Sequence, residues 1–522
     1  MKRTKDILKN TFTVGAFTAL SRVLGLVREM FQSRLIGAGM EQSAFTLAFA
    51  IPNMARKLFG EGALTAAFVP VFKGEAECES LEKATKLARA VMTMVLLMLG
   101  SLVLVSMGVL ETIVKFRAEL GLNDMVRLKL TIRLVKTLLP YMIFICGAAF
   151  GMGVLNSLGR FKAASFMPCL LNFCWNGILL WISFFPDMRL DQRIHRVSMA
   201  ILVAGALQMA FLFWRMHVAG VSPIPTFKGW KDPKTLLVWK NLGVAALGGG
   251  AVQINYMLDQ ILAQKASPWA AGVIGYAERL MDLPLGIIGV AFGTVLLPTF
   301  AGLFAKGEVE DARAALCSSV KSMMLIMIPA ALGMFALSDL ITEVIYQGGS
   351  FDATATLRVS RALAVYVLGL GFYGFQKSMV PWFQAQNDMK TPLKVSMVTV
   401  VVNATLNILA VFLLPEEWRH VGLAASTVVC ALVGAVLLVW KARKRNGHTG
   451  LRHIVLPLMK MTAAAMAMAL CLKALEPYLA GCASLIRLGV LISMGGAVYF
   501  GLMFLTMRQE LKLIRSHKRK ID

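Results

Sequence analysis

Apolar segments long enough to cross a lipid bilayer recur from about residue 13 to residue 507, and they constrain the fold more than any other feature. A helix needs roughly 20 apolar residues to cross a hydrocarbon core about 30 Å thick. Lipid offers no hydrogen-bond partners, so such runs must satisfy their own backbone as helices, and the roughly ten-residue alternation of an outer-membrane barrel is missing. The sequence therefore predicts an all-α polytopic membrane protein.

Composition supports lipid as the solvent for most of the chain, because 57% of the residues are hydrophobic and only 16% are charged. The net charge of +25 would also suit a nucleic-acid-binding protein. The basic residues, however, lie mostly between apolar segments and near residue 520, not on one soluble face, so we expect membrane lipids and no nucleic acid as partners. The eight cysteines are scattered through apolar segments and predict neither a disulfide framework nor a metal site.

The apolar pattern predicts about 14 transmembrane helices. We place them at residues 13–37, 43–73, 83–111, 128–157, 163–186, 196–219, 237–264, 268–304, 310–337, 353–385, 391–414, 419–441, 453–475 and 484–507. With the amino terminus inside, most lysines and arginines of the connections fall on the inner side, including the KARKR run at 441–445. This asymmetry predicts that both termini are cytoplasmic.

An internal repeat predicts two lobes. GALTAAFVPVFKGE at 62–75 is similar to GVAFGTVLLPTFAGLFAKGE at 289–308, and Tyr141 and Asn172 have counterparts in Tyr366 and Asn403. Six spans separate the copies, so they share an orientation and are expected to be related by a pseudo-two-fold axis along the membrane normal.

The predicted organisation has four parts. An N-terminal lobe of six helices occupies 1–219 and a C-terminal lobe of six occupies 237–445, while 446–522 holds two further helices and a basic cytoplasmic tail. Segment 220–236 is too short and too polar to span, so it is predicted to be a cytoplasmic linker at the membrane interface, with Trp230 and its lysines facing the headgroups.

Ionisable residues inside the predicted spans are the candidates for function, because each costs at least ~2.5–3.5 kcal/mol at mid-membrane unless it faces water or a partner. They are Arg22, Arg28 and Arg34 in the first span, Arg56, Lys57 and Glu61 in the second, and Glu278, Arg279 and Asp282 in the eighth. Arg22, Arg28, Arg56 and Arg279 outnumber the nearby acids, which predicts a cationic cavity. A guanidinium fork matches the oxygens of a phosphate or diphosphate.

A structural interpretation competes with the functional one. The arginines can reach the interface with their long side chains, or pair with Glu29, Glu61 and Glu278 as internal struts; for Arg34 and Lys57 both interpretations stay open. Asp259, Gln384, Asp388 and Asn403 are weaker candidates for a small-cation site, such as one for sodium. Their alternatives are interhelical hydrogen bonding for Asp259 and a cytoplasmic helix cap for Asp388.

No cofactor is implied and no nucleophile, metal-ligand or carboxylate constellation is present in the sequence, so we do not expect an enzyme. A membrane glycosyltransferase would need a catalytic carboxylate or metal-ligand cluster beside a sizeable extramembrane loop, and every predicted loop is short.

Three motifs carry a resemblance to a known family. SRVLGLVREMFQSRLIGAG at 21–39, AFAIPNMARKLFGEGALTAAFVPVF at 48–72 and YAERLMDLPLGIIGVAFGTVLLPTF at 276–300 together resemble the MurJ (MviN) family of lipid II flippases. That family belongs to a superfamily of two-lobed exporters of drugs, oligosaccharide-linked lipids and polysaccharides. The resemblance implies a bacterial inner-membrane protein that moves lipid II, an undecaprenyl diphosphate carrying a disaccharide-pentapeptide, from the inner to the outer leaflet.

The resemblance also assigns residues. The substrate-binding positions it implies are Arg22, Arg28, Arg56, Glu61, Glu278 and Arg279, and residues 453–507 match two helices whose groove is thought to hold the lipid tail. Ser43 departs from the family, which often has an aspartate there, so a carboxylate role at that position is in doubt.

The mechanism that follows is alternating access by a monomer, with the diphosphate bound by the cavity arginines and with the membrane potential or sodium as the energy source. Two alternatives are a flippase for another polyprenyl-diphosphate-linked glycan and a multidrug exporter. The second is disfavoured, because drug exporters typically handle cations and an arginine-lined cavity repels them.

Overall fold

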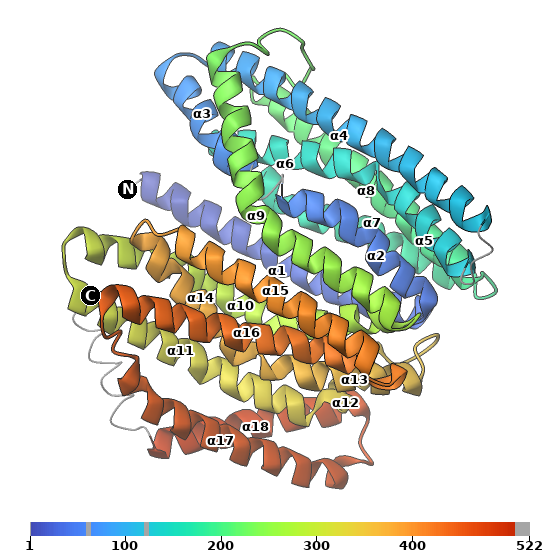
Figure 1. The fold of residues 1–522 in the computed structure, drawn as a ribbon, viewed down its shortest axis with the longest axis vertical. Helices are drawn as coiled ribbons and strands as arrows, with labels where there is room; N and C mark the ends of the chain where they lie inside the picture. The colour runs from blue at the N-terminus through green and yellow to red at the C-terminus, as the bar shows by residue number, and fades with distance from the viewer. Residues whose placement is uncertain (1, 59–63, 120–124, 507–522) are drawn as a thin grey trace. The chain divides into compact units, whose positions relative to one another are not determined.

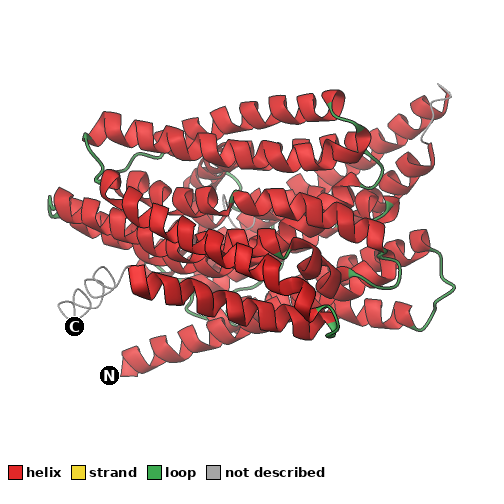
Figure 2. Cartoon of the chain, turned by 90° about the horizontal axis from the view of Figure 1, so that it is seen from below, coloured by secondary structure: helices red, strands yellow, loops and turns green. Residues whose placement is uncertain are grey.

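The computed structural model describes residues 2–58, 64–119 and 125–506, and their regular elements are helices (Figures 1 and 2). Within these ranges the single β-type pairing is an isolated bridge between Gly348 and Phe351. The all-α prediction is therefore confirmed.

The chain divides into two compact units. The first comprises Met1–Gln264 with Gly348–Phe351, and the second comprises Lys265–Gln347 with Asp352–Asp522. The predicted lobes meet at the linker 220–236, whereas the helix after the linker, Pro233–Ala266, belongs to the first unit as far as Gln264. The lobe boundaries at 219, 237 and 445 stay predictions.

The first unit contains nine helices within the described residues. They are α1 (Lys2–Ile36), α2 (Met40–Ala55), α3 (Leu64–Cys78), α4 (Leu81–Glu119), α5 (Met125–Leu138), α6 (Tyr141–Ser157), α7 (Phe161–Ser183), α8 (Leu190–Val218) and α9 (Pro233–Ala266). The main packing pairs are α1 with α7, α6 with α8, and α2 with α5. α1 is therefore held along its length by a helix more than a hundred residues later in the chain.

The second predicted span changes from α-helical to π-helical geometry after Ala55. Segment 43–73 corresponds to α2 and α3, with a wide π-helical turn at residues 56–58 after α2, and residues 59–63 lie outside the described part of the chain. Pro52 and Pro70 lie inside the two helices, where each lacks a backbone N–H donor. Apolar content predicted the segment but not the π-helical turn.

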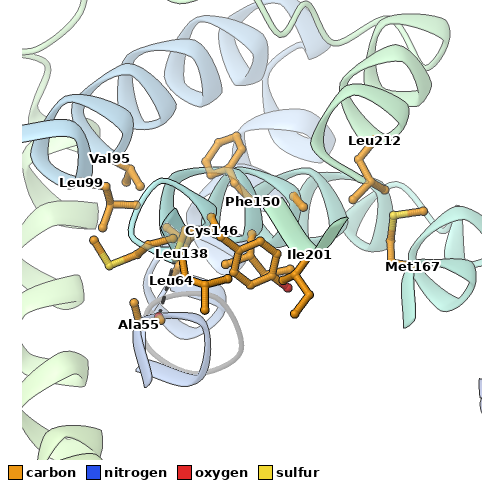
Figure 3. Close-up of a cluster of buried hydrophobic side chains, with 14 of the residues drawn as sticks. Ala55, Leu64, Val95, Leu99, Leu138, Cys146, Phe150, Met167, Ile201 and Leu212 are labelled. Carbon is orange, nitrogen blue, oxygen red and sulfur yellow. Dashed lines mark hydrogen bonds between the residues drawn. The ribbon is translucent and has the colours of Figure 1, made fainter. Parts of the chain in front are cut away.

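A buried apolar cluster fills the first unit and fixes the end of α2 (Figure 3). Phe150 of α6 packs against Phe68 of α3 with ring centroids 4.6 Å apart. The buried thiol of Cys146 lies 3.7 Å from the carbonyl oxygen of Ala55 and donates to it, as the dashed line in Figure 3 shows. A carbonyl near the widened end of α2 thus gains a partner from a neighbouring helix, as helix ends require.

The linker lies against the first unit through polar contacts. Arg89 Nε donates to the carbonyl oxygen of Ile224 (2.7 Å), and the backbone N–H of Thr226 donates to Thr93 Oγ1 (2.8 Å). Phe227 and Trp230 lie with ring centroids 5.4 Å apart, and 72% of Phe227 is exposed. A backbone-anchored segment with an exposed aromatic ring is typical of a membrane interface, and the assignment of 220–236 as a cytoplasmic interfacial linker stays a prediction.

The second unit contains the remaining helices. They are α10 (Ala270–Ala305), α11 (Val309–Ala336), α12 (Ser338–Tyr346), α13 (Ala353–Leu368), α14 (Leu370–Ala385), α15 (Lys390–Leu413), α16 (Glu416–Asn446), η2 (Leu451–Ile454), α17 (Val455–Leu475), η3 (Glu476–Leu479) and α18 (Ser484–Thr506). α17 lies beside α18 and also packs on α11 (Figure 1). Trp382 of α14 is fully buried against Phe300 and Phe304 of α10, at 5.6 and 4.9 Å between ring centroids.

Nine helices among the described residues are long and apolar enough to cross a membrane. A tenth results if α13 and α14, which meet at Gly369 with a bend of 42°, form one broken span. The chain is therefore a multi-pass membrane protein, and the predicted count of 14 is not confirmed.

Candidate functional site

Arg28 is the most constrained of the predicted site residues in the first unit. Its Nη1 donates to Asn172 Oδ1 of α7 (3.0 Å) and its Nη2 to Glu29 Oε1 (2.5 Å). Its guanidinium carbon lies 4.4 Å from the ring centroid of Trp175. The Arg28 and Glu29 side chains are 19% and 8% exposed, so this ion pair is largely removed from water.

A polar network along α1 and α7 holds the neighbours of Arg28. Asn172 Nδ2 donates to the carbonyl oxygen of Ser21 (3.0 Å), and Trp175 Nε1 donates to Gln32 Oε1 (2.9 Å). Gln32 Nε2 in turn donates to Gln42 Oε1 of α2 (2.9 Å). Interhelical polar contacts of this kind fix side-chain positions in a membrane protein.

The arrangement leaves one donor of Arg28 unsatisfied. Its Nε is buried and has no hydrogen-bond partner within the described residues. A guanidinium offers five N–H donors in a fixed plane, and a buried donor without an acceptor costs free energy. The site therefore combines the predicted strut, Arg28 with Glu29, and an unused donor.

The other predicted cations of the first unit have different environments. Arg56, half-buried after the end of α2, donates from Nε and Nη2 to Asn53 Oδ1 (3.0 Å each). Lys57 Nζ lies 5.2 Å from the ring centroid of Tyr256 of α9. Arg22 and Arg34 are exposed. Glu61 lies outside the described residues.

Glu278 and Arg279 belong to α10 in the second unit and are both half-buried. The hydroxyl of Tyr366 donates to Glu278 Oε1 (3.3 Å), and the Arg279 guanidinium carbon lies 5.7 Å from the ring centroid of Tyr276. Tyr346 donates to the carbonyl oxygen of Tyr276 (3.2 Å). Tyr346 of α12 and Tyr366 of α13 thus contact this part of α10. Arg279 and Arg28 belong to different units, and their convergence stays a prediction.

The candidate cation ligands are engaged in local contacts. Asp388 accepts hydrogen bonds from the backbone N–H and the hydroxyl of Thr391 (2.9 and 2.7 Å) and pairs with Arg445. Burial by itself would raise the pKa of Asp388, but these hydrogen bonds and the Arg445 charge bring the pKa below its ordinary value of 3.8. These contacts match the helix-cap alternative for Asp388.

Asn403, Asp259 and Gln384 complete that candidate set. Asn403 accepts from Asn407 Nδ2 (2.5 Å) within α15, and Asp259 accepts from Asn255 Nδ2 (3.4 Å) within α9. Gln384 is half-buried near the end of α14. The described residues contain no group of three or more His, Cys, Asp or Glu suited to a metal ion. The sodium site stays a prediction.

An apolar cavity of about 730 Å³ lies in the second unit among α11, α14, α16 and α17. Phe372, Phe375 and Val436 contribute to its wall, Leu458 and Thr462 come from α17, and Arg443 is the charged residue among those that line it. The resemblance implied a groove formed by 453–507, but only the first half of α17 contributes to this cavity and the rest of the lining comes from earlier helices.

The sequence identified Arg28 and Glu278 as candidates, but not the aromatic residues beside Arg28 and Arg279. Trp175 and Tyr276 lie among ordinary apolar residues in sequence, and nothing local distinguishes them. Tyr366 and Asn172 had one signal, because both belong to the internal repeat. The repeat partners have diverged in their contacts: Asn172 accepts from Arg28, whereas Asn403 accepts from Asn407.

Comparison with known proteins gives a consistent result. A family model described as "Lipid II flippase MurJ" matches residues 32–490. A "Probable lipid II flippase MurJ" of Rhizobium tropici is 32% identical over an alignment of 530 residues that covers 99% of this chain and 97% of the relative. The "Lipid II flippase MurJ" of Burkholderia cenocepacia is 30% identical over 448 residues, which is 84% of each chain.

Solved structures support the fold. The structure of "Lipid II flippase MurJ, inward closed conformation" matches with a TM-score of 0.77 at 22% identity, over 95% of this chain and 99% of that one. An inward-facing multidrug transporter of the MATE family matches with a TM-score of 0.65 at 15% identity, over 81% and 95% of the two chains. At these identities the likeness concerns the fold alone.

Proposed function

Because the chain belongs to the MurJ family of lipid II flippases, we propose that it moves lipid II from the cytoplasmic to the outer leaflet of the bacterial inner membrane by alternating access. In this proposal Arg22, Arg28, Arg56 and Arg279 contact the diphosphate, and Glu61 and Glu278 balance their charge. Both termini lie in the cytoplasm, and the protein acts as a monomer.

The environment of Arg28 supports this proposal most directly. Asn172, Glu29 and Trp175 fix its guanidinium from three sides, so little conformational freedom remains to be lost when a ligand binds. A diphosphate oxygen is the acceptor that its unsatisfied Nε lacks.

Alternating access requires the substrate to stabilise one conformation more than another. An unoccupied cavity that contains several arginines carries mutual repulsion, and a bound diphosphate removes it. The membrane potential then acts on the net charge that moves, at about 2.3 kcal/mol per charge per 100 mV. Sodium bound at Asp259, Gln384, Asp388 and Asn403 is the other proposed energy source.

The polyprenyl tail needs an apolar path while the headgroup crosses. The cavity among α11, α14, α16 and α17 offers an apolar wall, to which Phe372 and Val436 belong. An apolar cavity of about 730 Å³ suits a hydrocarbon chain. We assign the tail to this cavity.

The test is translocation of headgroup-labelled lipid II in vesicles with and without the protein. Arg28→Ala and Arg279→Ala should lower the rate to that of protein-free vesicles, because neutral side chains cannot bind the diphosphate. Arg189→Ala is the matched control, since this arginine is exposed and pairs with Asp191. Wild-type rates for Arg28→Ala would reject the assignment.

A double variant separates substrate binding from charge neutralisation. Arg28→Gln alone removes the cation that pairs with the buried Glu29, which is destabilising whatever the function. Arg28→Gln with Glu29→Gln removes both charges and restores an uncharged, hydrogen-bonded pair. If Arg28 binds the diphosphate, the double variant remains inactive although it is as stable as the wild type. Recovery of transport would show that Arg28 serves only as a strut.

The same vesicles test the alternative substrate. A second polyprenyl-diphosphate lipid with an unrelated glycan shares the diphosphate and the tail with lipid II. Rapid translocation of lipid II alone supports the proposal, whereas faster translocation of the other lipid favours the alternative flippase. Rejection of both lipids with extrusion of an organic cation would favour a multidrug exporter.

A further inference from the structure

A short hairpin, residues 348–351, docks on the end of α1. Gly348 and Phe351 exchange backbone hydrogen bonds of 3.0 Å, which closes the hairpin. The backbone N–H of Ser350 then donates to the carbonyl oxygen of Arg34 (2.7 Å), about three hundred residues earlier in the chain. We call residues 348–351 the strap.

The strap satisfies carbonyl groups that α1 cannot satisfy by itself. The last four carbonyls of a helix have no partner within it, and those of Arg34 and Leu35 are among them. Ser350 donates to Arg34 through its N–H and to Leu35 through its hydroxyl (3.4 Å). Arg193 Nη1 also donates to the Leu35 carbonyl (2.8 Å). The end of α1 is therefore capped from two other parts of the chain.

Two glycines make the approach close enough. Gly37 has φ +81° and Gly349 has φ +56°, in the left-handed region that favours glycine. A Cβ added at Gly37 would overlap the carbonyl oxygen of Ser350, and one added at Gly349 would overlap that of Arg34. Each of these would meet backbone atoms, which cannot rotate away as a side chain can.

The strap has an unusual place in the chain. It packs with the first unit, yet the chain before it, to Gln347, and the chain after it, from Asp352, belong to the second unit. Any movement of one unit relative to the other must therefore either carry the end of α1 along or detach the strap. The anchoring bonds join the exposed Gly349 and Ser350 to a helix end, whereas the adjacent Phe351 of the strap is buried.

We propose that residues 348–351 form a releasable strap that holds the end of α1 in one transport state and must leave it in the other. This inference rests on the proposed flippase function. The end of α1 lies on the outer side in the predicted topology, so a docked strap belongs to the state closed to the outside. Release lets α1 move and exposes the bound headgroup outward.

A reversible disulfide tests whether release is required. The Cβ position of residue 348 lies 3.6 Å from Arg34 Cγ, which is the place that the sulfur of a cysteine introduced at position 34 would take. Arg34→Cys with Gly348→Cys is made in a background in which the exposed Cys78 and Cys482 are replaced by serine. Because Gly348 has φ +137°, the Gly348→Cys single variant is the control for backbone strain. The oxidised protein should translocate labelled lipid II no faster than protein-free vesicles, and a reductant should restore transport.

The outcomes separate the two proposals. If the wild-type protein fails to flip lipid II in the same vesicles, the proposed function fails. If the reduced protein is active and the disulfide-linked protein is equally active, the strap need not detach and this inference is overturned.

A glycine pair gives an independent measurement. Gly37→Ala should displace the strap and lower the yield of the 34–348 disulfide several-fold under limiting oxidant. Gly159→Ala is the matched control, because Gly159 also has a positive φ of +72° but nothing lies within 4 Å of an added Cβ. Equal yields from the two variants would contradict a docked strap.

Discussion

At the residue scale, Arg28 lies among side chains that hold its guanidinium in place. Arg28 contacts an acid on its own helix and an amide and an indole on α7. The sequence predicted that Arg28 needs a partner, because a lone charge in lipid is costly. It did not predict Asn172 and Trp175 as those partners, since their approach depends on how α1 packs along α7.

Asn172 should contribute to transport through Arg28. Asn172→Leu keeps the approximate volume but removes the acceptor for Arg28 Nη1, so we expect translocation to fall several-fold. Asn176→Leu is the matched control: Asn176 lies one turn later on α7 and donates to the Leu24 carbonyl of α1 (3.0 Å), without a contact to Arg28. Both variants should lose about 1 kcal/mol of stability.

Vesicle transport normalised to folded protein separates the two asparagines. Equal losses of transport in the two variants would indicate that Asn172 contributes only through hydrogen bonds that hold α7 against α1.

Asp388 makes a pH-dependent prediction. Its lowered pKa means that the charged form is stabilised in the folded protein, so this stabilisation is present above pH 3.8 and is lost as the pH falls through the lowered pKa. Asp388→Asn keeps an acceptor for the Thr391 N–H but removes the charge that pairs with Arg445, so it should reduce stability by about 0.2–1 kcal/mol near neutral pH. The difference from wild type should shrink in acid.

Thermal unfolding in detergent at a series of pH values measures this effect. Arg445→Gln should show part of the same loss, because Arg445 pairs with Asp388. A deficit for Asp388→Asn that is constant across pH would contradict the assigned ionic role.

At the element scale, α6 and α8 pack so closely that one glycine is required. A Cβ at Gly205 of α8 would lie 2.5 and 2.7 Å from ring carbons of the fully buried Tyr141, which has no room to move. Gly205→Ala should therefore cost about 1–3 kcal/mol, the usual range for overpacking. Gly147→Ala is the control, because its added Cβ would meet the flexible Met209 side chain.

The melting temperatures of purified Gly205→Ala and Gly147→Ala provide the comparison. The first should melt several degrees below wild type and the second close to it. Equal destabilisation would mean that Met209 cannot adapt and that the two contacts are equivalent.

The helices themselves were largely predictable, but their interruptions were not. Segment 128–157 was predicted as one span, and Val126–Ser157 is one candidate span, with a two-residue turn at Leu139–Pro140 between α5 and α6. Segment 353–385 contains α13 and α14, bent by 42°. Hydropathy averages over many residues, so it registers an apolar run and misses a local turn or bend. Gly369 and Pro140 mark the breaks, yet other glycines and prolines, such as Pro168, lie inside continuous helices.

At the scale of the whole molecule, the sequence predicted two halves from the repeat, and two compact units are present. It did not predict that α9 would pack with the first of them. Lys234 at the start of α9 pairs with Glu75 and Glu79 near the end of α3. These charged residues lie at the ends of the apolar segments, so a hydropathy pattern does not report their pairing. The hydrogen bond from Lys83 and the charges of Lys83 and Lys234 lower the pKa of Glu79, which keeps that side of the contact ionised.

Transport should respond to membrane potential. If net charge crosses the field during a cycle, about 2.3 kcal/mol per charge per 100 mV is available to change the rate. Vesicles with an imposed potassium diffusion potential should therefore translocate lipid II at rates that differ with the sign of the potential, while the ionophore without a gradient has no effect. Equal rates at both signs, with a rate that depends on sodium, would favour the cation site instead.

The contact between the strap and α1 also has an evolutionary consequence. A side chain at Gly37 would overlap the carbonyl oxygen of Ser350, and a side chain at Gly349 would overlap the carbonyl oxygen of Arg34. Both glycines are therefore required by the same close approach. A descendant that replaces one of them gains little from keeping the other. Related sequences should thus retain or lose the two glycines together, a correlation that natural variation would record without any experiment on the protein.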